Sequence, residues 1–163
     1  MTVRNIYSFL IGIHIILYIG IVVTIATAIS LIGTSFPISE SISNPDELNE
    51  LKKYGAVEFF VIAIILVPLL ETSIFQKFVL YITSTLFRKI KHHSFFLPII
   101  ISGILFGLAH GYNMTYVVIG TLTGIVLAFF YSIALKRKES AFVVITIAHS
   151  IINLIPFFRD FIL

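Results

Sequence analysis

The feature that most constrains this chain is a series of long apolar stretches separated by short polar turns. An α-helix needs about 20 apolar residues to cross the hydrocarbon core of a bilayer. Stretches that reach or approach this length occupy residues 6–32, 56–87, 95–110, 114–135 and 141–158. The sequence therefore predicts an all-α fold, a polytopic transmembrane helical bundle with about five membrane segments.

The composition agrees with a protein that lies in lipid. Of 163 residues, 58% are hydrophobic and 12% are charged, whereas soluble domains contain about 25% charged residues. The length suits a single membrane domain over residues 1–163, with a first span at 6–32, a polar loop at 33–55 and a helical core at 56–158. The chain has no cysteine, which excludes disulfides and a thiolate nucleophile. A net charge of +3 is too small to predict nucleic-acid binding.

Basic residues predict the orientation of the chain. They occur before the first span at Arg4, after the second span at residues 88–91, and after the fourth span at residues 136–138. Lys and Arg are enriched in cytoplasmic loops, and one orientation places all three groups on the same side. We therefore predict a cytoplasmic N-terminus. The first stretch is longer than the apolar region of a signal peptide, so we interpret it as a retained span.

Ionisable residues at bilayer depth are the candidates for function, because insertion of each costs roughly 2.5–3.5 kcal/mol. The second stretch contains Glu71, followed by Thr72 and Gln76. Thr72 and Gln76 are four residues apart, a spacing that places two side chains on one face of an α-helix. These residues could serve a catalytic site, or they could form hydrogen bonds between helices.

Three histidines also lie within the apolar stretches. His110 ends the third stretch and shares a helical face with Phe106, and His149 shares a face with Asn153 in the fifth. Taken singly, His110 could be an interfacial residue, and the His149–Asn153 pair could join two helices. His14, in the first stretch, has no polar neighbour at helical spacing, so we interpret it as structural.

Together the main groups supply the parts of a hydrolase. A glutamate can act as a base toward water, a histidine can hold that water or donate a proton, and a second histidine with an asparagine can stabilise an oxyanion. At 1.5 Å per residue, Glu71 and His110 both lie about 25 Å from the basic loop at 88–91. His149 and Asn153 lie about 16–23 Å from the basic turn at 136–138 by the same rise. We therefore expect these four residues to form one site.

The order of these motifs resembles the CPBP family of intramembrane proteases, which contains the type 2 CAAX prenyl proteases and the bacteriocin-processing (Abi) enzymes. The resemblance covers residues 68–153 and includes F-x-x-x-H at 106–110 and H-x-x-x-N at 149–153. The first family motif is usually two glutamates followed, after three residues, by arginine. Here Glu71 matches the first glutamate, whereas Thr72 replaces the second and Gln76 replaces the arginine.

The resemblance implies a glutamate-type endopeptidase. We expect it to lie in a bacterial cell membrane and to need no cofactor, zinc being the less favoured possibility. The resemblance also implies that Glu71 and His110 activate the attacking water and that His149 and Asn153 form the oxyanion hole, with Phe106 in a supporting role. We expect Thr72 and Gln76 to support the site through a neutral hydrogen bond, which compensates for the lost charged pair. The expected partners are the lipid bilayer and a peptide or membrane-protein substrate, for example a bacteriocin leader.

Alternatives from other functional classes stay open at this point. Glu71 with two histidines could bind zinc, with water as the fourth ligand, although Asn153 is a poor zinc ligand and H-E-x-x-H is absent from the sequence. The chain could also be a non-catalytic bacteriocin-immunity or scaffold protein, an interpretation favoured by the changes at Thr72 and Gln76. A transporter has less support, because the sequence lacks repeated halves.

Overall fold

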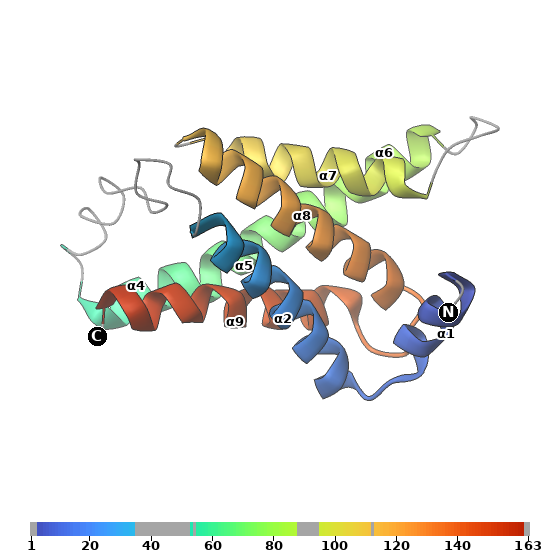
Figure 1. Ribbon diagram of the computed structural model, residues 1–163, viewed down its shortest axis with the longest axis horizontal. Helices are drawn as coiled ribbons and strands as arrows, with labels where there is room; N and C mark the ends of the chain where they lie inside the picture. Colours follow the sequence, from blue (N-terminus) through green and yellow to red (C-terminus); the bar gives the residue numbers. More distant parts are fainter. Residues whose placement is uncertain (1–2, 35–52, 54, 88–94, 112, 162–163) are drawn as a thin grey trace.

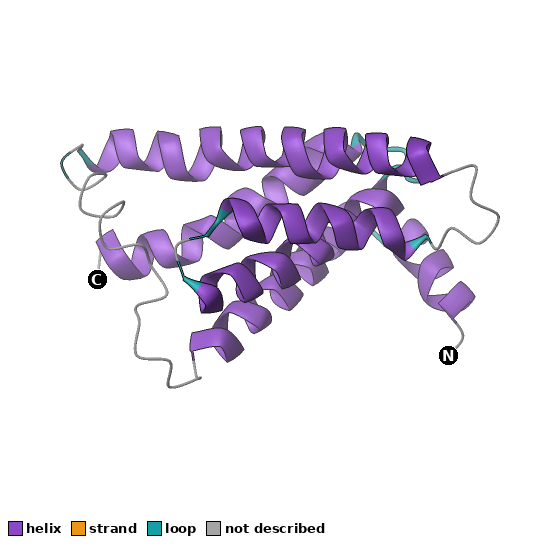
Figure 2. Cartoon of the chain, turned by 90° about the horizontal axis from the view of Figure 1, so that it is seen from above, coloured by secondary structure: helices purple, strands orange, loops and turns teal. Residues whose placement is uncertain are grey.

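The computed structural model describes residues 3–34, 53, 55–87, 95–111 and 113–161. Most of the predicted polar loop at 33–55 lies outside the described residues, as do the basic residues at 88–91. Over the described residues the regular structure is entirely helical and contains no strand (Figure 2). The elements in chain order are α1 (Val3–Gly12), α2 (Ile15–Thr34), α4 (Ala56–Phe60), η1 (Val61–Leu66), α5 (Val67–Glu71), η2 (Thr72–Val79), α6 (Leu80–Phe87), α7 (Phe96–Ala109), α8 (Met114–Ala134) and α9 (Ala141–Phe161) (Figure 1).

The predicted all-α polytopic bundle is confirmed. Helices long and apolar enough to cross a membrane occupy Ile15–Gly33, Ala56–Phe87, Met114–Ala134 and Ala141–Phe158 among the described residues. The shorter helix α7 is also apolar, and it packs along α8. The protein is therefore an integral membrane protein, with the lipid bilayer as its surroundings.

The predicted first span at 6–32 is not one helix, because the chain breaks between α1 and α2. The guanidinium of Arg137 donates hydrogen bonds to the carbonyls of Leu10 (2.6 Å) and Ile13 (2.8 Å). His14 Nδ1 accepts a hydrogen bond from the backbone N–H of Ile16 at 3.3 Å. His14 therefore caps the start of α2, in line with its predicted structural role. The spanning segment is Ile15–Gly33.

The second stretch forms one continuous helix from Ala56 to Phe87, although Pro68 lies within it. Proline lacks the backbone N–H that an α-helix uses. Two π-helical segments, η1 and η2, flank the short α5 that contains Pro68 and Glu71. In these segments the backbone is wound with i→i+5 hydrogen bonds, a geometry that occurs often at functional sites. Glu71 is thus the last residue before a change in helical winding.

This long helix runs antiparallel to α9. Near one end, the ring of Phe59 stacks on Phe157 with centroids 5.5 Å apart. Toward the other end, the Nζ atom of Lys77 lies 5.5 Å from the ring centroid of Phe142. Contacts at both ends hold the middle of α9 beside the middle of the long helix.

Helices α7 and α8 approach each other closely through glycine. A Cβ atom on Gly107 would lie 2.6 Å from both the backbone N of Thr121 and the backbone O of Val117. A Cβ atom on Gly124 would lie 3.0 Å from the Cα of Gly103. Small residues allow the backbones of membrane helices to meet in this way, and the contact holds the end of α7 against α8.

We therefore expect Gly107→Ala to destabilise the protein by about 1–3 kcal/mol, because the methyl group meets backbone that cannot rotate away. Thermal unfolding in detergent measures this loss. Gly20→Ala on α2 is the matched control, since no atom lies within 4 Å of a Cβ at that position and both substitutions gain the same helix propensity. Equal unfolding temperatures for the two variants would contradict the predicted packing.

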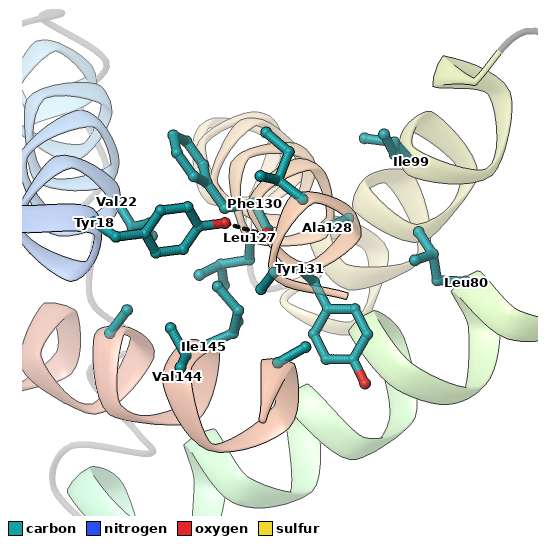
Figure 3. Packing of buried hydrophobic residues seen from close by; sticks show 14 of the residues in the cluster. Tyr18, Val22, Leu80, Ile99, Leu127, Ala128, Phe130, Tyr131, Val144 and Ile145 are labelled. Carbon is teal, nitrogen blue, oxygen red and sulfur yellow. Dashed lines mark hydrogen bonds between the residues drawn. The ribbon is translucent and has the colours of Figure 1, made fainter. Parts of the chain in front are cut away.

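The apolar core is centred on α8. Leu127 of α8 and Ile145 of α9 are fully buried in this core, together with Val22 of α2 (Figure 3). The hydroxyl of Tyr18 on α2 donates a hydrogen bond to the backbone carbonyl of Phe130 on α8. The core thereby fixes α9, the helix that carries His149, against α2 and α8.

Candidate functional site

Glu71, His110 and His149 meet in one cluster, although they come from three separate helices. The Glu71 Oε1 atom lies 3.2 Å from His110 Nε2. The Glu71 Oε2 atom lies 3.3 Å from His149 Nε2. The His149 side chain is only 3% exposed, whereas those of Glu71 and His110 are 19% and 22% exposed. One side of the Glu71–His110–His149 cluster is therefore buried and the other is accessible.

The histidine at the end of α7 is held by its own helix. His110 Nδ1 lies 2.7 Å from the carbonyl oxygen of Phe106, and its ring lies 4.5 Å from the Phe106 ring, centroid to centroid. Because a carbonyl only accepts, Nδ1 carries a proton. Nε2 is therefore the His110 ring nitrogen that faces Glu71 Oε1.

In His149, the histidine on α9, the ring nitrogen that does not face Glu71 lacks, in the described part of the chain, the backbone partner that it has in His110. His149 Nε2 faces Glu71, and the buried Nδ1 atom has no hydrogen-bond partner among the described residues. In a neutral imidazole one nitrogen donates and the other accepts. The contact with Glu71 therefore assigns the proton of His149 to Nε2, so that Nε2–H donates to the carboxylate. The Phe106 ring lies 5.7 Å from the His149 ring and thus contacts both histidines.

The fourth predicted residue, Asn153, lies one turn after His149 on α9. Its Nδ2 atom donates a hydrogen bond to the backbone carbonyl of Ala63 in η1 at 3.1 Å. This bond joins α9 to the long helix. The structure therefore brings Glu71, His110 and His149 together, whereas the amide N–H of Asn153 is directed at the backbone of η1.

Residues 54–155 match the family model described as type II CAAX prenyl endopeptidase Rce1-like. The chain belongs to this family. The matched segment runs from the start of the long helix into α9, and the resemblance inferred from the sequence motifs is confirmed. The comparisons with curated proteins and with solved structures found no match.

Thr72 and Gln76 were predicted to form a hydrogen bond with each other, and the structure shows none between them. Both side chains are fully buried. The Oγ1 atom of Thr72 and both polar atoms of the Gln76 amide have no hydrogen-bond partner among the described residues. Both residues lie in η2 and both face the interior, yet their polar atoms form no hydrogen bond with each other.

Two contacts in this Rce1-like chain, one between the helices that carry the cluster and one at His110, were not predicted. The Ser102 hydroxyl, buried on α7, donates to the backbone carbonyl of Phe75 in η2 at 2.9 Å. The ring of Tyr116 on α8 lies 5.6 Å from the His110 ring in an edge-on arrangement. Ser102 precedes His110 by two helical turns on the same face, so the helical spacing of α7 contained a signal for it. Tyr116 lies beyond a turn and had no such signal.

The zinc ligand set considered from the sequence combines Glu71 with two histidines. In the structure the Nε2 atoms of His110 and His149 contact opposite oxygens of Glu71 directly. The described part of the chain contains no group of three His, Cys, Asp or Glu residues placed to hold a metal ion.

Proposed function

We propose that this protein is an intramembrane endopeptidase of the glutamate type, which hydrolyses a peptide bond of a membrane-associated peptide or protein. The observation that carries the proposal is the position of the Glu71 carboxylate between His110 and His149, on three apolar helices. Membership of the Rce1-like family supports a peptidase. The partial exposure of Glu71 and His110 supports access of water and substrate to the accessible side of the cluster.

In the proposed reaction Glu71 is the base and His110 the acid. With His110 protonated, the pair contains a carboxylate that takes a proton from water and an imidazolium that can donate one. The hydroxide attacks the carbonyl carbon of the scissile peptide bond. When the C–N bond breaks, His110 gives its proton to the leaving nitrogen, and the products are a carboxylic acid and an amine.

The proposed oxyanion donors are His149 and Asn153. When Glu71 accepts the proton of water, it loses its negative charge and holds the His149 Nε2–H less strongly. That N–H then becomes available to the oxygen on which negative charge develops. Asn153 adds a second donor if its amide leaves the carbonyl of Ala63.

The proposal is tested with the full-length protein in proteoliposomes and a set of lipidated and unmodified membrane-associated peptides. The reaction is run in water enriched in ¹⁸O and the products are weighed by mass spectrometry. We expect two fragments, of which the N-terminal one carries a single ¹⁸O in its new carboxyl group. Intact peptides throughout, with a folded protein, would contradict a hydrolase.

The variant Asn153→Ala distinguishes two roles of Asn153: a donor to the oxyanion, or a tether, meaning only the hydrogen bond to Ala63 that joins α9 to the long helix. We expect a loss of about 10²–10³ in the turnover number, the usual cost of removing one oxyanion donor. The stability should fall by only about 0.6 kcal/mol, the mean for a hydrogen bond between membrane helices. Initial cleavage rates and thermal unfolding measure the two effects. A stability loss with unchanged turnover would assign Asn153 to the tether alone.

A further inference from the structure

An apolar cavity lies away from the Glu71–His110–His149 cluster. It has a volume of about 560 Å³ and lies between α1, α2, α7 and α8. Its lining on α7 comes from Phe96, Ile99 and Ile100, near the start of the helix that ends at His110. At 1.5 Å per residue this part of α7 lies about 15 Å from His110. The cavity is thus separate from the proposed catalytic site.

Every residue that lines this cavity is aliphatic or phenylalanine. An apolar cavity offers water no polar partners, and one of about 150 Å³ takes up benzene. The cavity here is open at the surface, because its wall residues Phe9 and Phe96 are 49% and 50% exposed. Scaled by volume, this cavity holds on the order of 20 carbon atoms, which is close to the size of one acyl chain. Its walls on α2 and α8 belong to membrane-spanning segments, so the surrounding medium supplies such chains.

The turn between α8 and α9 lies next to the cavity, and its charged residues indicate which kind of lipid headgroup fits there. The wall residue Leu10 is bonded through its carbonyl to Arg137 at 2.6 Å. Arg137 is flanked by Lys136 and Lys138, whose side chains are exposed. The carboxylate of Glu139 is paired with Arg137 at 3.1 Å, and the hydrogen bond from Arg137 holds the pKa of Glu139 below its usual range. The turn therefore presents two exposed ammonium groups beside one end of the cavity.

We propose that the cavity binds one acyl chain of an anionic phospholipid, whose phosphate lies at Lys136 and Lys138. The wall segment of α8 from Ile125 to Phe130 ends about 9 Å before Lys136 at the helical rise, a distance that an extended acyl chain covers. Ammonium groups at a membrane surface attract anionic lipids. The bound lipid is independent of the proposed peptidase activity, since the cavity and the cluster share no residue.

The test is native mass spectrometry of the full-length protein in mild detergent, with dioleoyl phosphatidylglycerol or dioleoyl phosphatidylcholine. We expect one phosphatidylglycerol per chain, retained roughly tenfold better than phosphatidylcholine. Val126→Trp fills the cavity and should lower retention of both lipids several-fold. The matched control is Val118→Trp on the same helix, because Val118 is 54% exposed and does not line the cavity.

Two further sets of variants distinguish binding of the lipid acyl chain from binding of its headgroup. Lys136→Gln with Lys138→Gln should remove the preference for phosphatidylglycerol and leave phosphatidylcholine binding unchanged. Ile25→Trp, on the α2 wall, replaces Val126→Trp if that variant does not fold.

The proposal fails if Val126→Trp and Val118→Trp retain lipid equally, or if wild-type protein retains both lipids equally. It also fails if a lipidated peptide without phosphate displaces phosphatidylglycerol at equal concentration, because the occupant is then a substrate chain.

Discussion

Glu71→Gln in the full-length protein is expected to reduce peptide hydrolysis by about 10²–10⁴-fold, the usual contribution of a positioned acid or base. The amide has nearly the same shape as the carboxylate, but it cannot take a proton from water. It also cannot accept from both His110 and His149, because its nitrogen only donates. Initial rates of peptide cleavage in proteoliposomes measure the effect.

The matched control is Glu58→Gln, which removes an exposed carboxylate from the same continuous helix. We expect wild-type rates from it, because Glu58 lies on α4, outside the cluster. Unfolding temperatures and expression of both variants must match the wild type for the comparison to hold. A rate for Glu71→Gln within tenfold of the wild type would contradict the role of Glu71 as base. Survival of a bacteriocin-immunity phenotype in this variant would identify a non-catalytic protein.

Helical spacing predicted the contact between Phe106 and His110 because α7 is regular up to Ala109, the residue before His110. Phe106 and His110 are four residues apart on α7, and the structure places their rings in contact. The same rule places Thr72 and Gln76 on one face, and both are fully buried, but their polar atoms form no hydrogen bond with each other. Helical spacing predicts which residues share a face, but it does not predict the side-chain conformations that a hydrogen bond between them needs.

Spacing also cannot show what lies opposite a side chain. His149 and Asn153 share a face of α9 as predicted, yet His149 meets Glu71 while Asn153 meets the carbonyl of Ala63. The difference follows from the antiparallel long helix, whose different segments face successive turns of α9. The partner of each residue is therefore decided by packing between helices that the sequence alone did not specify.

The break in the first predicted span has the same origin. Residues 6–32 are apolar throughout, so hydropathy predicts one helix. The carbonyls that end α1 are instead taken by Arg137, which is 127 residues away from Leu10 along the chain. A contact across this separation leaves no periodic pattern in the sequence. Arg137 was assigned only to the basic group that sets orientation, and its structural role was missed.

Arg137→Ala is expected to cause the largest loss of stability among the substitutions considered. The side chain is only 3% exposed. Its guanidinium donates to the carbonyls of Leu10 at 2.6 Å, Ile11 at 3.1 Å and Ile13 at 2.8 Å, and it lies 4.6 Å from the ring centroid of Tyr18. A buried acceptor that loses its donor costs about 1–3 kcal/mol, and Arg137→Ala removes the donor from three carbonyls at once. Thermal unfolding in detergent measures the loss.

Two control variants separate the guanidinium from charge alone. Lys136→Ala removes a neighbouring exposed cation and should change stability by less than about 0.5 kcal/mol. Arg137→Lys keeps the charge but loses the planar fork that reaches several carbonyls at once, so its stability should lie between Arg137→Ala and the wild type. The role of Arg137 as the link between α1 and the α8–α9 turn is wrong if Arg137→Ala unfolds at the same temperature as Lys136→Ala. If the link is correct, loss of Arg137 frees three carbonyls at the end of α1, and this helix should become the first part of the protein to exchange its amide hydrogens.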